Sequence, residues 1–223
     1  MKINIAIDGP SGAGKSTIAK LVATKLGYVH LDTGAMYRLT AYKAHTTGVA
    51  INDEIALVEM LKNTEIKILP DGSIYLDTNK INDEIRTEEI STLASQVSKF
   101  KTVREYLVNL QQKIALDKGY ILDGRDIGTV VLKDAEVKIF LTATNEARAQ
   151  RRQKQNESKG IKSDYQKVLE DIINRDYQDT SRENSPLQKA NDANLIDCSD
   201  LSIDEVVFKI LNQVNEVIRW LVV

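Results

Sequence analysis

The fold of this chain is decided by one stretch at its start, Ile3-Asn4-Ile5-Ala6-Ile7-Asp8-Gly9-Pro10-Ser11-Gly12-Ala13-Gly14-Lys15-Ser16-Thr17. The short apolar residues up to Ile7 predict a buried strand, and residues 9–16 fit the pattern G-x-x-x-x-G-K-[ST] at every fixed position. Apolar residues then recur at helical spacing: Ile18, Leu21, Val22 and Leu26. The motif therefore lies between a predicted strand and a predicted helix, which is the context that a phosphate-binding loop requires.

The residue types of this loop suit a nucleoside triphosphate and Mg²⁺. Glycines allow backbone N–H groups to turn inward around an anion, and the helix that begins here adds the positive end of its dipole. Lys15 supplies an ammonium group for the outer phosphates, and Ser16 supplies a hydroxyl for Mg²⁺. A glycine-rich turn without a ligand would need neither group. We therefore expect the triphosphate to be bound by Gly9, Pro10, Ser11, Gly12, Ala13, Gly14, Lys15, Ser16 and Thr17.

The composition is that of an ordinary globular protein and excludes several classes of function. Of the 223 residues, 42% are hydrophobic and 28% are charged, which is enough to fill a core. The net charge of -2 argues against a general nucleic-acid binder, which usually has a basic excess. Cys198 is the single cysteine, so no internal disulfide can form, and with two histidines besides no zinc cluster can be assembled.

We expect neither a signal peptide nor a membrane span. The apolar run at the N-terminus ends at Asp8 and lacks a basic region and a cleavage site. Residues 203–223 are apolar on one helical face and polar on the other, which indicates a helix that docks on a globular core. With the single cysteine, these features predict a cytoplasmic protein without a membrane or nucleic-acid partner. We expect it to be a monomer.

Buried strands alternate with helical segments along most of the chain. The predicted strands lie at about residues 3–7, 28–31, 120–123, 137–141 and 194–197. This alternation predicts an α/β fold of three layers, in which helices cover both faces of a mainly parallel five-stranded sheet. Ligands of such sheets bind beyond the carboxyl ends of the strands, where Asp8, Asp32 and Asp123 are expected to lie.

Two segments depart from this alternation within what we expect to be a single P-loop domain, residues 1–223. In residues 64–90, apolar and polar residues alternate on either side of Pro70-Asp71-Gly72, which predicts a β-hairpin and a small antiparallel insertion. Residues 148–165 join a predicted helix to a polar loop at 156–162, and we expect them to form a helical lid. Three capping boxes predict helix starts: Thr102 with Glu105, Ser163 with Gln166, and Ser202 with Glu205.

Charged residues near the ends of predicted elements suggest a second anionic site beside the loop. Asp123-Gly124-Arg125-Asp126 follows a buried strand, where a Walker B carboxylate is expected, and Arg38 and Arg104 lie near the ends of other elements. Spacings of four and three residues place Arg175, Asp179 and Arg182 on one helical face. Such a set can also be an exposed ion-pair stripe worth only a few tenths of a kcal/mol. A similar basic stripe precedes Gly160: Arg148, Arg151 and Arg152.

These segments, taken together, resemble those of bacterial cytidylate kinases. The resemblance is carried by residues 9–17, by Asp32-Thr33-Gly34-Ala35-Met36-Tyr37-Arg38, by Asp123-Gly124-Arg125-Asp126-Ile127-Gly128-Thr129-Val130-Val131 and by Arg175 to Arg182. Ser95-Gln96-Val97 and Val103-Arg104-Glu105 also fit that family. The matches come in the family's order and extend across nearly the whole chain, insertion included. The phosphate loop is shared by many kinases, whereas the second and third segments are much more specific.

The resemblance implies that the protein transfers the γ-phosphoryl group of ATP, with Mg²⁺, to CMP or dCMP. It places Ser95, Arg104 and Asp126 at the cytosine, Arg175 and Asp179 at the sugar region, and Arg38, Arg125 and Arg182 at the acceptor phosphate, with Thr33 in the bordering turn. It also implies that Arg148, Arg151 or Arg152 of the lid contacts the ATP phosphates. The residues expected to act in catalysis are Lys15, Arg125, Arg148, Arg152 and Arg182, with Ser16 at Mg²⁺.

The chemistry of phosphoryl transfer agrees with these assignments. The reaction needs alignment and charge neutralisation more than an enzymic base, and a nucleoside monophosphate is largely dianionic near neutral pH because its second pKa is about 6. A carboxylate such as Asp126 can accept a hydrogen bond from the exocyclic amine of cytosine, whereas uracil has a carbonyl there. A polar mismatch of this kind can discriminate between substrates by several orders of magnitude.

Two other functions remain to be weighed. The first is another small-molecule P-loop kinase, with UMP, AMP or a sugar acid as the acceptor. The second is a GTPase-type switch, which needs a guanine-reading N-K-x-D motif. The nearest string is Asn79-Lys80-Ile81-Asn82, which has an amide in place of the carboxylate and lies in the predicted insertion.

Overall fold

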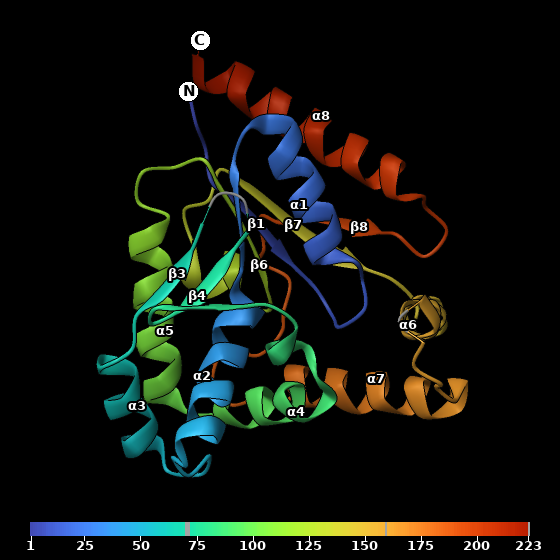
Figure 1. Cartoon of the computed structure of the whole chain (residues 1–223). Helices are drawn as coiled ribbons and strands as arrows, with labels where there is room; N and C mark the ends of the chain where they lie inside the picture. Colours follow the sequence, from blue (N-terminus) through green and yellow to red (C-terminus); the bar gives the residue numbers. More distant parts are fainter. Residues whose placement is uncertain (70–71, 159, 223) are drawn as a thin grey trace.

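The computed structural model describes residues 1–69, 72–158 and 160–222, and its centre is a five-stranded sheet (Figure 1). The strands are β1 (Ile5–Asp8), β2 (Val29–Asp32), β6 (Tyr120–Gly124), β7 (Val137–Thr142) and β8 (Asn194–Asp197). They pair in the order β2-β6-β1-β7-β8, and every pairing is parallel. The predicted strands and their parallel arrangement are confirmed. Since parallel neighbours need crossover connections, helices separate these strands along the chain.

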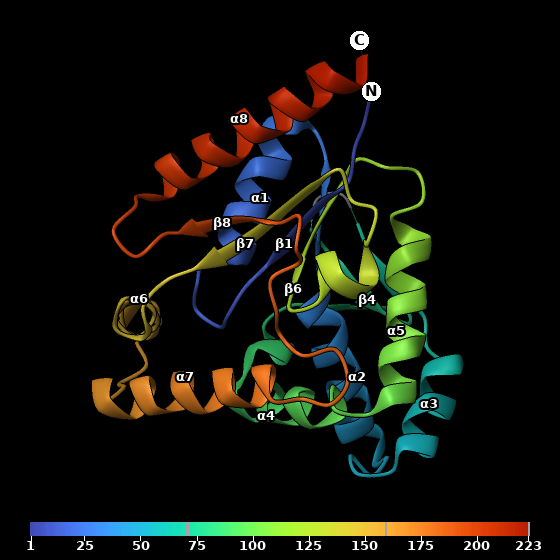
Figure 2. The ribbon, with the colours of Figure 1, turned by 180° about the vertical axis from the view of Figure 1, so that it is seen from behind.

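Helices cover both faces of the sheet, so that each face has its own core (Figures 1 and 2). On one side lie α1 (Lys15–Leu26) and α8 (Ile203–Val222), and on the other lie α2 (Thr33–Thr47), α3 (Glu54–Lys62) and α5 (Lys101–Ile114). Successive side chains of a strand point to opposite faces. Accordingly, Ile5 and Ile7 of β1 pack under α1 and α8, whereas Ala6 joins the core of the other side.

The predicted antiparallel insertion is also confirmed. It consists of β3 (Ile66–Ile68), β4 (Ile74–Leu76) and β5 (Asn79–Ile81), paired in that order, and a 3₁₀ turn follows it (Asp83–Arg86). In the predicted hairpin turn, Pro70 and Asp71 lie outside the described residues, and Gly72 has a φ of 83°. Apolar side chains from all three strands pack into the core beside α2: Ile66, Ile74, Leu76 and Ile81.

The capping box predicted for α5 is wrong. The helix begins at Lys101 with Phe100 before it, and no side chain caps it. The backbone N and Oγ1 of Thr102 donate instead to Oε1 of Glu54, at 2.7 and 2.6 Å. Glu54 lies in α3, which packs against α5, so a partner distant in sequence replaces the local cap.

The two later capping predictions have different outcomes. The helix α7 (Tyr165–Thr180) is capped one residue later than predicted, because Asp164 rather than Ser163 accepts from the N–H of Lys167, at 2.9 Å. The box before α8 is confirmed: the N–H of Ser202 donates to Glu205 at 2.8 Å, and the N–H of Glu205 donates to Ser202 Oγ at 3.3 Å.

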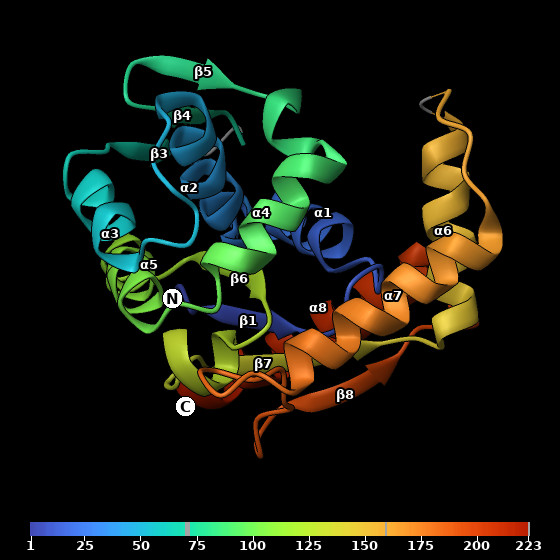
Figure 3. The same cartoon turned by 90° about the horizontal axis from the view of Figure 1, so that it is seen from below.

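Three helices lie beyond the carboxyl ends of the strands, namely α4 (Glu88–Val97), α6 (Asn145–Ser158) and α7. Seen from below, they follow one another around the region where the strands end (Figure 3). The predicted loop at 156–162 is shorter than expected, because α6 continues to Ser158; Lys159 lies outside the described residues. In the described part of the chain, every helix is too short or too polar to cross a membrane.

Candidate active site

A cleft of about 680 Å³ opens at the carboxyl ends of the strands, between the phosphate loop and helices α4, α6 and α7. It brings together most of the residues that the sequence nominated. Those that line it are Ser11, Gly12, Ala13, Gly14, Lys15, Ser16, Thr17, Thr33, Arg38, Ser95, Arg104, Arg125, Asp126, Arg151, Arg152, Arg175, Asp179 and Arg182. Among the nominated residues, Gly9, Pro10 and Arg148 do not line it.

The phosphate loop is built tightly against the end of β7. At Gly9, a Cβ atom would lie 1.9 Å from the carbonyl oxygen of Leu141, so only glycine fits. Nζ of Lys15 donates to the carbonyl of Pro10 at 2.8 Å. Burial, helped by the charge of Arg125, lowers the pKa of Lys15 to about 7. An ammonium that is costly to bury is stabilised by an anion, so this lysine favours a phosphate beside it.

Side-chain oxygen atoms suited to a metal ion lie together where α1 begins beside the end of β6. Oγ of Ser16 donates to Oδ2 of Asp123 at 2.8 Å, and His30 Nε2 donates to the other carboxylate oxygen at 2.6 Å. Oγ1 of Thr33 donates to the backbone carbonyl of Asp123 at 2.7 Å. A hydroxyl next to a carboxylate fits Mg²⁺, which prefers oxygen ligands and keeps several waters. Among the described residues, no group of three or more His, Cys, Asp or Glu side chains could hold a metal ion by itself.

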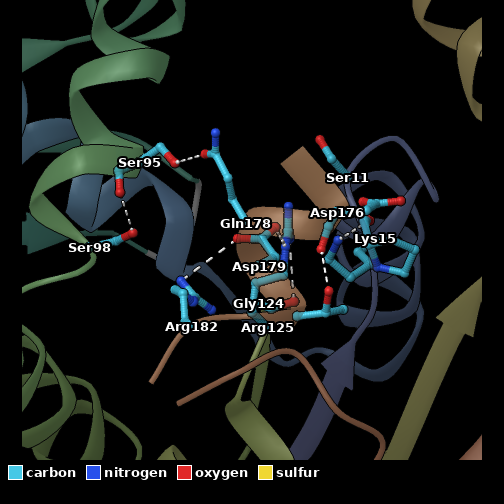
Figure 4. Close-up of polar contacts among 12 residues, drawn as sticks. Ser11, Lys15, Ser95, Ser98, Gly124, Arg125, Asp176, Gln178, Asp179 and Arg182 are labelled. Carbon is cyan, nitrogen blue, oxygen red and sulfur yellow. Dashed lines mark hydrogen bonds and ion pairs between the residues drawn. The ribbon is translucent and has the colours of Figure 1, made fainter. Parts of the chain in front are cut away.

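Carboxylates hold the arginines of the second predicted anionic site in place (Figure 4). Arg125 Nε donates to Oδ2 of Asp179 at 2.7 Å, and Arg182 Nη1 lies 3.7 Å from Oδ1 of the same residue. Arg182 lies after the end of α7 rather than on the predicted helical face, yet it still meets Asp179. Burial would raise the pKa of Asp179, but Arg125 and Arg182 bring it below its ordinary value. Arg38 pairs with Asp32 at 2.7 Å in the same way.

Two further arginines, Arg175 and Arg152, line the cleft without an acidic partner among the described residues. Arg175 forms no hydrogen bond or ion pair within the described ranges, and burial together with Arg125 lowers its pKa to about 10. Arg152 contacts Gln155 at 3.2 Å, and burial together with Arg38 lowers its pKa. Like charges that crowd a partly buried cleft are unfavourable without a counter-ion, so this arrangement is suited to a highly charged anion.

A buried ion pair lies at the far end of the cleft. Arg104 Nη2 donates to Oδ2 of Asp126 at 2.5 Å, and its Nη1 donates to the carbonyl of Ser98 at 3.1 Å. The side chains of Arg104 and Asp126 are 5% and 7% exposed. The guanidinium lies over the ring of Tyr37, 5.3 Å from the centroid. Ser95 Oγ donates to Oε1 of Gln178 on α7 at 3.3 Å, across the cleft (Figure 4).

The sequence analysis missed several residues that line the cleft. Tyr37 stands in the segment that carries the resemblance, so an aromatic residue there could have been noticed. Arg86 and Ser91 enter from the insertion and from α4, and no motif marked them. Apolar residues from the loop before α8 and from its first turn line the end of the cleft near the phosphate loop: Leu201, Ile203 and Val206.

Arg148 differs from the other lid arginines because its side chain is 3% exposed and turned away from the cleft. Its Nε donates to the carbonyl of Ala143 at 3.0 Å, and Nη1 donates to the carbonyl of Ser11 at 2.8 Å. Nη2 donates to Asn145 at 2.5 Å and also to Asp176. Direct contact between Arg148 and the ATP phosphates therefore stays a prediction, and the lid arginines that line the cleft are Arg151 and Arg152.

Comparison with known proteins identifies the family of this chain. The family model described as Cytidylate kinase matches residues 5–216. The chain belongs to the cytidylate kinase family. The cytidylate kinase of Caldicellulosiruptor bescii is 51% identical over 221 residues, which cover 98% of each chain. The cytidylate kinase of Bacillus subtilis is 48% identical over 218 residues, which cover 96% of this chain and 97% of the relative.

Solved structures with little sequence similarity share the fold of this cytidylate kinase family member. Shikimate kinase from Bacteroides thetaiotaomicron has a TM-score of 0.52 at 12% identity and covers 96% of this chain and 99% of its own. TT1252 from Thermus thermophilus has a TM-score of 0.51 at 15% identity, with 97% of each chain covered. At such low identity the likeness concerns the P-loop α/β architecture alone, whereas the family is shown by the relatives of about half-identical sequence.

Proposed function

We propose that this protein transfers the γ-phosphoryl group of ATP to CMP or dCMP and releases ADP with CDP or dCDP. The observation that carries the proposal is the buried pair of Arg104 and Asp126, which lies in one cleft with the arginine cluster and the phosphate loop. The Asp126 carboxylate accepts from the exocyclic amine of cytosine, a pairing that uracil does not offer. Ser95 completes the contacts with the base.

In this proposal the acceptor phosphate is bound by Arg38, Arg125 and Arg182. Two of these are already oriented by Asp179 and the third by Asp32, so little side-chain entropy is lost when the phosphate arrives. Arg175, which has no ion-pair partner among the described residues, and Asp179 hold the sugar region. Thr33 shapes the turn between β2 and α2 next to them.

The transfer itself needs no enzymic base. An oxygen of the acceptor phosphate, already largely deprotonated at neutral pH, forms the new bond to the γ-phosphorus as the bond to the β–γ bridging oxygen breaks. Lys15, Arg125, Arg152 and Arg182 surround the region where this charge moves, and Lys15 takes up a proton when the phosphates bind. Charge stabilisation by oriented cations is the main contribution to catalysis here.

Mg²⁺ fits the corner formed by Ser16 and Asp123. The Ser16 hydroxyl would bind the ion together with phosphate oxygens and water, while Asp123 orients that hydroxyl. When bound, the ion neutralises charge on the outer phosphates of ATP. His30 and Thr33 keep the Asp123 end of β6 in place, so the hydroxyl is presented in a fixed position.

We further infer that residues 64–90 form a unit on the acceptor side and that residues 148–165 form the lid within one kinase domain. The lid brings Arg152 over the ATP phosphates and excludes water. The small-molecule substrates, the single cysteine and the net charge of -2 together favour a monomeric cytoplasmic enzyme without a nucleic-acid or membrane partner.

A panel of acceptors tests the proposal. ATP and Mg²⁺ are supplied with CMP, dCMP, UMP, AMP or gluconate, and ADP release is followed by a coupled assay. We expect kcat/KM for CMP or dCMP to exceed that for every other acceptor by at least about a hundredfold. Faster turnover of UMP, AMP or gluconate would refute the assignment of the base site. Nanomolar GTP binding without acceptor-dependent turnover would favour a switch instead.

A further inference from the structure

The phosphate loop is supported from outside by Arg148 of α6. At Gly12, a Cβ atom would lie 3.2 Å from Cβ of Arg148, so helix and loop are in close contact. Gly12 also has a φ of 77°, a backbone conformation that residues with a side chain rarely adopt. Each of the three guanidinium nitrogens of Arg148 donates a hydrogen bond to a protein oxygen. One of these acceptors belongs to the phosphate loop: the carbonyl of Ser11, at 2.8 Å from Nη1.

The contact with Ser11 fixes the orientation of one peptide group. A trans peptide is planar, so the carbonyl of Ser11 and the N–H of Gly12 point in opposite directions. Arg148 Nη1 holds the carbonyl towards α6, and the Gly12 N–H therefore faces the opposite side, where Gly12 lines the cleft. Phosphate loops bind anions through backbone N–H groups, so the orientation of this peptide bears directly on ATP.

Asp176 of α7 in turn holds Arg148 through an ion pair. Its Oδ2 accepts from Nη2 of Arg148, while its buried Oδ1 has no hydrogen-bond partner among the described residues. The neighbouring residue Arg175 lines the cleft, as does Asp179 one turn later. The same helix therefore carries residues of the acceptor site and a carboxylate that reaches the support of the phosphate loop.

We propose that Asp176 and Arg148 are positioning residues for ATP: Asp176 fixes Arg148, and Arg148 orients the Ser11–Gly12 peptide so that its N–H faces the phosphates. This inference rests on the proposed binding of ATP by the loop. It gives Arg148 a role different from the direct phosphate contact expected from the sequence. If Arg148 positions the loop, its ion pair with Asp176 supports ATP binding. If Arg148 contacts the phosphates itself, Asp176 competes with them for the guanidinium, and this difference provides the test.

The test compares Asp176→Asn with Asp171→Asn. Asp171 is an exposed carboxylate of α7 that makes no hydrogen bond or ion pair in the described chain, so its variant controls for the loss of a charge on the same helix. Titration calorimetry measures the dissociation constants of ATP with Mg²⁺ and of CMP, each without the other substrate. We expect Asp176→Asn to weaken ATP binding about tenfold or more, with CMP binding changed less than about twofold, because misplacing a binding group by about 1 Å can cost up to a hundredfold. Asp171→Asn should leave both constants unchanged.

If Arg148 contacted the phosphates itself, loss of its competing carboxylate would leave ATP binding unchanged or tighten it, and either result would overturn the proposal. Equal weakening of ATP and CMP binding would also overturn it, since that is the effect of a purely structural defect. Should Asp176→Asn fail to fold, Asp176→Glu keeps the charge and displaces it by one methylene; parental ATP affinity in that variant would contradict the inference. A parental enzyme that binds ATP but does not phosphorylate CMP would refute the proposed function and leave this test intact.

Discussion

The replacement of Asp126 by asparagine tests the base-reading end of the cleft most directly. The carboxylate is 7% exposed on its side chain and lies 2.5 Å from Arg104, so asparagine preserves the shape while removing the negative charge. An amide can accept through its oxygen and donate through its nitrogen. The variant should therefore lose its preference for the amine of cytosine and tolerate the carbonyl of uracil.

The size of the effect follows from the charged hydrogen bond that is lost. Hydrogen bonds to charged groups contribute about 1.5–3 kcal/mol, and about 1.36 kcal/mol corresponds to a tenfold change in rate. The ratio of kcat/KM for CMP to that for UMP should fall about 13- to 160-fold. Among the described residues, no hydrogen bond or ion pair joins Arg104 or Asp126 to the phosphate loop. The KM for ATP should therefore change less than about twofold, since sites that share no partners behave nearly independently.

The assay follows ADP release at saturating ATP and Mg²⁺ while CMP or UMP is varied. Asp134→Asn serves as the matched control, because Asp134 is exposed and makes no hydrogen bond or ion pair within the described residues. Asp126→Asn should also have a lower Tm than the parent, since the buried guanidinium of Arg104 loses its counter-ion. A CMP-to-UMP ratio equal to that of the parent would show that another group reads the base.

Three other substitutions test the loop. Lys15→Ala should lower kcat at least about a hundredfold, because a cation beside the transferred group is lost. The pKa of Lys15 is about 7 in the free parent, so ATP binding at pH 8 should be accompanied by proton uptake. Calorimetry in two buffers should detect this uptake in the parent and none in Lys15→Ala. Ser16→Ala should raise the Mg²⁺ concentration needed for half-maximal ATP binding about tenfold, and an unchanged requirement would place the ion elsewhere. Gly9→Ala should prevent stable folding, since its Cβ would lie 1.9 Å from the oxygen of Leu141, whereas Gly48→Ala, in open space at a φ of 74°, should cost only about 1 kcal/mol in urea unfolding.

The sign of the Lys15 effect on stability follows from its lowered pKa. The unfolded lysine keeps its proton up to its ordinary pKa of 10.5, whereas the folded one loses it near 7. Between these values the unfolded state binds more protons, so this residue makes the free energy of unfolding rise with pH. Below about pH 7 the buried charge destabilises the free protein, and bound phosphates relieve that cost.

The fold could be predicted from the sequence because its signals are local and agree with one another. Each strand of the sheet is a short apolar run, and the alternation with helices allows few arrangements other than a parallel sheet. The insertion was equally clear, because the alternation of Ile66 and Ile68 with polar residues has the period of a strand.

What the sequence could not reveal are contacts between segments distant in the chain. Thr102 has the local pattern of a helix cap, but Glu54 of the packed helix α3 takes both of its donors. Arg182 was placed on a helical face that ends before it, yet the turn after α7 returns it to Asp179. In both cases tertiary packing overrides the local pattern, and helix ends are where such patterns are least decisive.

The lid arginines show why residue type and spacing do not assign roles within the candidate site. Arg148 and Arg152 are four residues apart on α6 and have the same chemistry, so the sequence treats them alike. Arg148 has acceptors for the donors on all three of its nitrogens, which makes its burial tolerable. Within the described part of the chain, Arg152 donates a hydrogen bond only to the side chain of Gln155. A buried, fully paired cation has little interaction left for a substrate, while a cation crowded by like charges gains most when an anion arrives. The functional difference between these two arginines therefore lies in how completely hydrogen-bond acceptors and counter-ions surround each guanidinium group, which only the folded structure determines.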